Sequence, residues 1–163
     1  MVALEQLRSP TARFEGRGRK ARWPGLSVVA MVLEILLGVG ALGGGIALMV
    51  GPNGEILPLP VSALAGSPFA NYFVPGAILF AILGLGPLVA AGLAWRRHPL
   101  APFLTVATGG ALIIWLLVEI AIVGYTNHPP LQAVYLGLGI VMALVGVAWG
   151  QSVSKQRRVE FRP

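Results

Sequence analysis

Two glutamates lie inside long apolar runs of this chain, and they are the main candidates for a chemical role. Glu34 lies within residues 26–50, and Glu119 lies within residues 101–125. A charged side chain near the centre of a bilayer costs at least about 2.5–3.5 kcal/mol, so both glutamates should face the protein interior and either find donors or carry a proton. Carboxylates in a hydrophobic wall can carry protons or bind a cation, but they do not define a reaction by themselves.

Other catalytic chemistry has little support in the sequence. The chain contains no cysteine, which excludes disulfides, thiolate catalysis and thiolate metal sites. The signatures HExxH, GxSxG and GxxxxGKS do not occur. The two histidines, His98 and His128, fall on opposite sides of the membrane in the topology derived below. We therefore expect no catalytic residue, no metal site and no cofactor, and the balance is against an enzyme.

Four apolar runs are long enough to be transmembrane helices. They cover residues 26–50, 72–95, 101–125 and 131–150, and about 20 residues suffice to cross a hydrocarbon core about 30 Å thick. The runs lack the alternation that marks transmembrane β-strands. The composition, with 56% hydrophobic and 11% charged residues, is also that of a membrane protein. The sequence predicts an all-α membrane protein, a bundle of four transmembrane helices arranged as two hairpins.

All 12 Lys and Arg residues lie on one side of this arrangement. They fall in residues 1–22, 96–100 and 151–163, whereas the loop 51–71 and the turn 126–130 contain none. The positive-inside rule then places both termini in the cytoplasm of a multi-pass plasma-membrane protein. A basic rim facing anionic lipid explains the net charge of +6, so we expect lipid as a partner and no nucleic acid.

The transmembrane domain is expected to span residues 23–150, between a mobile basic tail at 1–22 and a basic tail at 151–163. The loop 51–71 is rich in proline and apolar residues, so it should lie on the outer surface of the bundle, with a short interfacial helix near residues 61–65. Pro87 should kink the second helix. Three tryptophans are expected at the cytoplasmic interface: Trp23, Trp95 and Trp149.

Small and polar residues mark the helix faces that should be buried. On the first helix they recur at steps of three or four: Ser27, Ala30, Glu34, Gly38, Ala41 and Gly45. On the third helix the polar residues also share a face: Thr105, Thr108, Trp115 and Glu119. Close backbone approach at small residues holds transmembrane helices together. Gly40-x3-Gly44 and Gly146-x3-Gly150 have the spacing for such contacts.

A rise of 1.5 Å per residue places the polar side chains in depth. Glu34 lies about 12 Å from the inner end of its helix and Thr108 about 10 Å from the inner end of its own, so the two can meet. Glu119 lies about 9 Å from the outer end, where Gln132 and Tyr135 enter the last helix. The two glutamates differ by about 15 Å in height, so they cannot form one paired-carboxylate site unless other groups bridge them.

We interpret the surroundings of Glu119 as a candidate polar site with two alternatives. Either a small cavity opens there to the outer face, or Tyr135 donates a hydrogen bond to Glu119 and fixes the packing of the last two helices. The candidates within the membrane are Glu119, Tyr135, Trp115, Gln132, Glu34 and Thr108. The candidates at the outer face are Asn71, Tyr125 and His128.

Three stretches of the chain resemble a family of small, uncharacterised bacterial four-helix integral membrane proteins: LPLPVSALAGSPFANYFVPG, WLLVEIAIVGY and LQAVYLGLG. The resemblance covers residues 27–150 and implies a four-helix architecture and a bacterial origin. That family has no known activity, so the resemblance adds nothing catalytic. In that family we expect an acidic residue where this chain has Asn71, and often an amide where it has Glu119.

Three functions are consistent with these residues. The first is a non-enzymatic accessory or structural membrane protein, in which the glutamates are packing groups. The second is a small oligomeric transporter or channel component, coupled to protons or cations through Glu34 and Glu119. The third is a membrane enzyme that acts on lipid at the outer leaflet, with Glu119 as acid or base. We expect the first, with a second copy of the chain or another membrane protein as a candidate partner within the bilayer.

Overall fold

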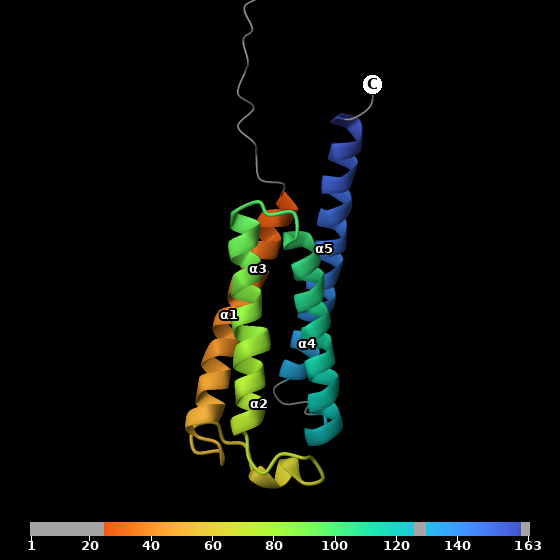
Figure 1. Ribbon diagram of the computed structural model, residues 1–163. Coiled ribbons are helices and arrows are strands. Elements are labelled where there is room, and N and C mark those ends of the chain that lie inside the picture. Colours follow the sequence, from red (N-terminus) through yellow and green to blue (C-terminus); the bar gives the residue numbers. More distant parts are fainter. Residues whose placement is uncertain (1–24, 126–129, 161–163) are drawn as a thin grey trace, which may run out of the picture.

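Four long apolar helices form two antiparallel hairpins (Figure 1). The computed structural model describes residues 25–125 and 130–160, with side chains as far as Lys155. The first hairpin pairs α1 (Gly25–Val50) with a rod of three consecutive segments. These are α2 (Phe73–Ile78), the π-helical η2 (Leu79–Leu85) and α3 (Gly86–Trp95). The second hairpin consists of α4 (Ala101–Val123) and α5 (Leu131–Glu160). The described residues contain no strand.

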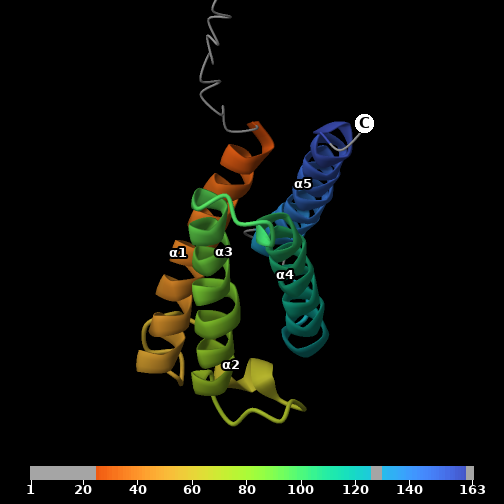
Figure 2. The ribbon, with the colours of Figure 1, turned by 45° about the horizontal axis from the view of Figure 1, so that its top comes forward.

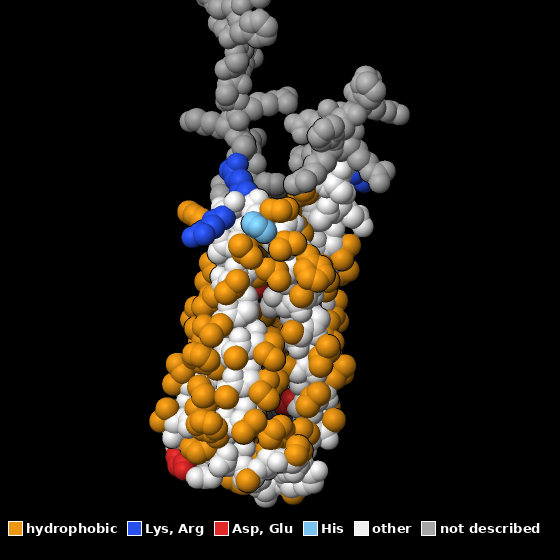
Figure 3. Space-filling model, viewed as in Figure 1, with side chains coloured by type: hydrophobic (Ala, Val, Ile, Leu, Met, Phe, Trp, Pro, Cys, Tyr) orange, Lys and Arg blue, Asp and Glu red, His pale blue; other side chains and the backbone are white. Residues whose placement is uncertain are grey.

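Each hairpin contributes two spans that are long and apolar enough to cross a membrane. The four spans have a mean hydropathy of 2.1 to 2.3: Gly25–Val50, Phe73–Trp95, Ala101–Val123 and Leu131–Lys155. The all-helical class with four such helices is therefore as predicted. The surface is apolar along most of its length, and Lys and Arg side chains gather at one end (Figure 3).

We call the end with Arg96, Arg97 and Lys155 the basic end, and the end with the connection between α1 and α2 the loop end. α5 differs from the prediction at the basic end, because it continues to Glu160 where we had expected a helix end at residue 150 and a tail. No glycine or proline follows Gly150 before Pro163, so no strong helix breaker interrupts this stretch. α5 therefore extends beyond the start of α4 (Figure 1).

Backbone contact at glycines holds each hairpin together. In the second hairpin, a Cβ atom added to Gly109 would lie 2.6 Å from the Gly139 carbonyl oxygen. In the first, a Cβ atom added to Gly45 would lie 2.8 Å from the Gly76 carbonyl oxygen. Such close approach is what packs helices against one another in lipid, where the hydrophobic drive between helices is small.

The predicted small-residue face of α1 is confirmed, whereas Gly40 and Gly44, which have the x3 spacing, make no close helix contact. Ser27, Ala30, Glu34, Gly38, Ala41 and Gly45 are all buried. Gly40 instead has open space around its Cβ position, and Gly44 has only an ordinary contact with Leu79 at 3.5 Å. On α5, Gly146 is in close contact with α4, whereas the Cβ position of Gly150 lies 3.6 Å from Pro102. The x3 spacing alone did not identify the face that meets a neighbour.

Pro87 lies within the rod, just after the π-helical segment η2. A proline lacks the amide hydrogen, and its ring crowds the carbonyl four residues earlier, here that of Leu83. The wider turn of η2 (Leu79–Leu85) accommodates this conflict within the helix. The chain runs through Pro87 as one rod, where we had expected a kink (Figure 1).

The two hairpins meet along a seam, with α1 and α3 on one side and α4 and α5 on the other (Figure 2). At the basic end of the seam, Ala30 and Ala94 pack against Ala101 and Trp149. Trp149 is only 5% exposed, so it belongs to the core rather than to the predicted interfacial belt. Trp95 is 70% exposed, and Trp23 lies outside the described residues.

The connection between α1 and α2 covers the loop end and links the hairpins. It contains a 3-10 helix, η1 (Val61–Leu64), where we predicted a short interfacial helix. Leu64 and Tyr72 form a buried cluster against which Ile122 of α4 packs. The Tyr72 hydroxyl donates a hydrogen bond to the Pro60 carbonyl oxygen at 3.0 Å, which fastens the loop to the start of α2.

Glu55 in this loop is expected to titrate below the ordinary range of a glutamate. Its own backbone N–H has the largest effect, and the side chain and backbone N–H of Asn53 add to it, so that the pKa of the Glu55 carboxyl is lowered. The Asn53 bonds measure 3.0 Å from Nδ2 to Oε1 and 2.8 Å from the backbone nitrogen to Oε2. Because the folded pKa is lowered, this contact is present above the ordinary value of 4.5 and is lost as the pH falls through the folded pKa.

Asn53→Ala should therefore raise the pKa of Glu55 toward 4.5, as measured by NMR titration of the full chain in micelles. Ser62→Ala, elsewhere in the same loop, is the control and should leave that pKa where it is. An identical Glu55 titration in the Asn53→Ala variant and the unaltered protein would show that the Asn53 side chain does not hold the carboxylate.

Candidate functional site

Glu34 occupies the seam between the hairpins, about 14 Å along α1 from its first residue at 1.5 Å per residue. Its side chain is completely buried, with an exposure of 0%. Neither carboxyl oxygen has a hydrogen-bond partner among the described residues. An ionised carboxylate without donors costs several kcal/mol in such a place. The group must therefore hold a proton or be balanced by a bound cation.

Two threonines of α4 face the Glu34 carboxyl group. The hydroxyls of Thr105 and Thr108 approach it closely, and both side chains are buried. Each hydroxyl donates its hydrogen to its own helix instead, Thr105 to the Ala101 carbonyl at 3.1 Å and Thr108 to the Leu104 carbonyl at 2.8 Å. A hydroxyl whose hydrogen is already donated presents only lone pairs to a neighbour. With their hydrogens directed to the backbone, the two threonines present hydroxyl oxygens to Glu34.

This arrangement suits a small positive species. The two Glu34 oxygens and the two threonine hydroxyl oxygens are acceptors brought together in a buried place. A protonated Glu34 can donate to either hydroxyl, and hard cations bind oxygen sets of this kind. Within residues 25–125 and 130–155 no three His, Cys, Asp or Glu side chains cluster. Because a single carboxylate balances one positive charge, the site is suited to a proton or a monovalent cation.

The buried polar residues near Glu34 lie on the side of the basic end. Ser27 lies two turns nearer that end on the same face of α1, and it is buried, as is Thr105. On the other side an apolar cluster from both hairpins separates Glu34 from the loop end: Leu37, Ala41, Leu83, Leu112, Leu116 and Met142. Glu34 therefore lies between two apolar clusters, with the buried hydroxyls of Ser27 and Thr105 on its basic-end side.

Glu119 lies beyond the apolar cluster on the loop-end side of Glu34, and its partner differs from the one expected. Its Oε1 accepts a hydrogen bond from Nε2 of Gln132 at 3.1 Å, and Gln132 also donates to the Gly124 carbonyl at 3.2 Å. Gln132, Gly139 and Gly146 are seven residues apart and share the face of α5 that packs on α4. Tyr135 is turned away from that face and is 39% exposed. The predicted bond from Tyr135 to Glu119 is therefore replaced by one from Gln132.

The outer-face candidates do not gather around Glu119. Asn71 Oδ1 accepts a hydrogen bond from the Phe73 backbone N–H at 3.1 Å, which forms an Asx turn at the start of α2. Tyr125 is exposed, and Trp115 is partly buried against the central apolar cluster. His128 lies outside the described residues. The structure thus brings together Glu34 with Thr108 and Glu119 with Gln132, as two separate pairs on either side of the central apolar cluster.

Thr105 also faces Glu34, but it was not among the candidate site residues. The sequence carried a signal for it, because Thr105 precedes Thr108 by three residues on the same face of the helix. The sequence predicted both the depth of Thr105 and the helix face on which it lies. We selected Thr108 alone as the candidate, although both threonines fit.

The Gln132–Glu119 hydrogen bond should contribute about 0.6 kcal/mol to stability and at most about 1.7 kcal/mol, as measured for side-chain bonds between transmembrane helices. A double-mutant cycle of Glu119→Ala and Gln132→Ala yields this coupling from free energies of unfolding in micelles. Tyr135→Phe is the control, and we expect it to leave the free energy of unfolding unchanged. A coupling near zero, or a loss with Tyr135→Phe, would count against the observed pairing.

No protein-family model matches this chain, and no curated protein or solved structure shows significant similarity to it. The bacterial membrane family that it resembles stays an expectation.

Proposed function

We propose that this protein is a component of a membrane transporter or channel that is coupled to protons or monovalent cations, with Glu34 as the ion-binding group. The observation that carries this proposal is the completely buried Glu34 carboxyl, which has no hydrogen-bond partner among the described residues. Ionisable groups in membrane-spanning helices are functional candidates by default. An accessory or structural role, which the sequence favoured, gives no reason for an unpaired carboxyl where an apolar residue would pack at lower cost.

In this proposal the basic end lies in the cytoplasm, together with both termini, and the loop end lies outside. Lys and Arg favour the cytoplasmic side of plasma-membrane proteins, which supports that orientation. The ion would reach Glu34 from the cytoplasm past the buried hydroxyls of Ser27 and Thr105. This entry requires the apolar cluster at the basic end of the seam to open.

Release toward the other side requires the central apolar cluster to open. Both hairpins contribute to this cluster, with Leu83 on one side and Leu112 on the other. Contacts within each hairpin include backbone atoms at glycines, such as Gly109 against Gly139. The seam is therefore the natural plane of movement, with each hairpin acting as a rigid body, and a rocking motion of one against the other would expose Glu34 to alternate sides.

The experiment is ion flux into liposomes that contain the purified full-length protein, under imposed gradients of H+, Na+ or K+. We expect one of these ions to move, and Glu34→Gln to abolish the movement because an amide cannot bind and release a proton and carries no charge. Glu119→Gln is the matched control, since it makes the same change at a carboxylate with a hydrogen-bond donor, and it should retain flux. Flux that survives Glu34→Gln, or folded protein that moves none of the three ions, would contradict the proposed function.

A further inference from the structure

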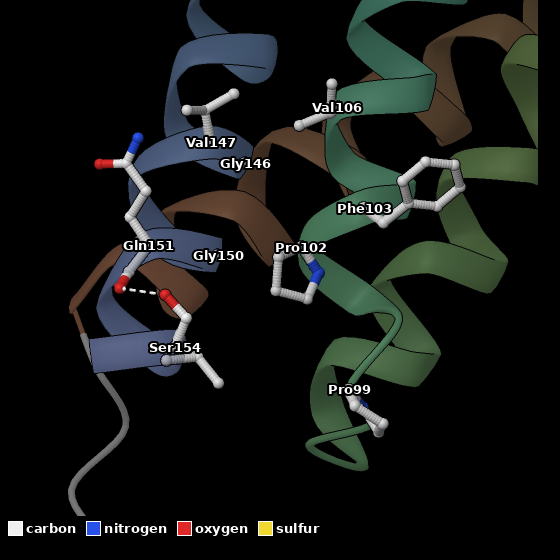
Figure 4. A pocket seen from close by; sticks show the side chains of 10 residues that line it. Pro99, Pro102, Phe103, Val106, Gly146, Val147, Gly150, Gln151 and Ser154 are labelled. Atoms are coloured by element: carbon white, nitrogen blue, oxygen red, sulfur yellow. Dashed lines mark hydrogen bonds between the residues drawn. The ribbon is translucent and has the colours of Figure 1, made fainter. Parts of the chain in front are cut away.

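A groove of about 450 Å³ lies between the first turns of α4 and the part of α5 beside them, at the basic end (Figure 4). Its lining is mostly apolar and includes Pro102, Phe103 and Val147. Gly146 and Gly150 on α5 also line it, and their missing side chains leave the space between the helices open. Phe103 is 68% exposed, so the groove faces away from the bundle core.

The groove opens toward the basic end because the two helices part there. A Cβ atom at Gly146 would lie 2.9 Å from the Pro102 carbonyl oxygen, so the helices touch at this level. At Gly150 the corresponding position is 3.6 Å from the Pro102 side chain, with no other atom within 4 Å outside its own helix. α5 then continues to Glu160 without α4 beside it.

Polar groups line the groove toward this opening, and one described cation lies a helical turn beyond them. Gln151 and Ser154 line the groove, and the Ser154 hydroxyl donates to the Gln151 carbonyl oxygen at 2.9 Å (Figure 4). Val147, Gln151 and Lys155 follow one another at four-residue steps on one face of α5, so Lys155 stands one turn beyond the apolar part. The acidic side chains that the structure describes are Glu34, Glu55 and Glu119, and none of them lines the groove.

We propose that this groove binds an anionic glycerophospholipid, with an acyl chain between α4 and α5 and the phosphate headgroup beside Lys155. An apolar channel with a cation at its mouth is complementary to a molecule that has an apolar chain and an anionic head. A second copy of the chain is the poorer occupant, because two copies in the same orientation would bring two basic ends together. The lipid site does not depend on ion binding at Glu34.

The test is native mass spectrometry of the full-length protein released from micelles that contain phosphatidylglycerol or phosphatidylcholine with identical acyl chains. We expect one phosphatidylglycerol to be retained in preference to phosphatidylcholine. Lys155→Gln should weaken phosphatidylglycerol retention about fivefold, as expected for one cation near the headgroups. Gly150→Leu should weaken retention of that lipid by filling the groove, and Gly137→Leu is its control because the Cβ position of Gly137 on the same helix has no atom within 4 Å.

Three results would overturn the inference. The first is equal retention of the two lipids, and the second is phosphatidylglycerol binding that neither Lys155→Gln nor Gly150→Leu reduces. The third is a dimer that Gly150→Leu dissociates, since this would show that a second copy occupies the groove. If Gly150→Leu does not fold, Lys155→Gln still decides the question, because it changes an exposed residue at the mouth of the groove.

Discussion

Replacing Glu34 by methionine is expected to stabilise the protein, raising its free energy of unfolding by about 1–3 kcal/mol while abolishing ion flux. The carboxyl is completely buried and its two oxygens have no partner in the described part of the chain. Removing it therefore removes two buried oxygens that the structure leaves without a hydrogen-bond partner in the described residues. Methionine fills a similar volume with an unbranched, adaptable side chain. The measurement is the unfolding free energy in micelles.

Glu119→Met is the matched control, and it should lower the free energy of unfolding where Glu34→Met raises it. Glu119 accepts a hydrogen bond from Gln132, so Glu119→Met removes a contact that the structure contains. We expect a loss of about 0.5–1.5 kcal/mol there. If Glu34→Met proved as destabilising as Glu119→Met, Glu34 would be a packing group with partners, and the case for an ion site would fall.

Gly109→Ala is expected to destabilise the second hairpin by about 1–3 kcal/mol, the usual cost of adding atoms to a closely packed contact. The new Cβ atom would lie 2.6 Å from the Gly139 carbonyl oxygen and 2.7 Å from the Ala143 nitrogen. Both are backbone atoms, so no side chain can rotate away, and α4 and α5 must separate. The unfolding free energy in micelles measures the effect.

Gly110→Ala is the control on the same helix, one residue further along. Its Cβ position has no atom within 4 Å. Alanine is also the better helix former by up to about 1 kcal/mol, so this variant should be as stable as the original protein or more stable. Equal losses from Gly109→Ala and Gly110→Ala would mean that the change of helix propensity, and no backbone contact, is responsible.

Depth along the helices could be predicted from the sequence, because a helix has a fixed rise per residue. Counting residues at this rise placed Glu34 and Thr108 at similar heights, and the structure brings them together. It also separated Glu34 from Glu119, and an apolar cluster lies between them. The buried face of α1 could be predicted as well, since six small or polar residues recur at helical steps and no comparable stripe competes with them.

Rotation of a helix about its axis was harder to predict, because it depends on the neighbour and not on the helix alone. Tyr135 and Gln132 enter the membrane from the same side, and depth cannot choose between them as the donor to Glu119. The choice follows from the contact of Gly139 with Gly109, which turns Gln132 inward. The spacing Gly40-x3-Gly44 is uninformative for the same reason, since the Cβ position of Gly40 has no atom within 4 Å.

Local competition for hydrogen bonds explains the other differences. Asn71 was expected to line a cavity, but the unpaired backbone N–H groups at a helix start are stronger competitors for a short amide side chain. Its oxygen accordingly accepts a hydrogen bond from the Phe73 N–H, the first of α2. The end of α5 was placed too early because a membrane span ends where apolar residues end, while a helix ends only at a breaking residue or cap.

The central claim is that the Glu34 carboxyl takes up and releases a proton or exchanges it for a cation. Infrared difference spectroscopy of the full-length protein in lipid tests it directly, using the carboxylic acid C=O band that is absent from the Glu34→Gln variant. We predict that this band disappears reversibly as the bulk pH is raised or as Na+ or K+ is added. A Glu34 band that stays constant at every pH at which the protein remains folded, with or without added cation, would contradict the proposed function.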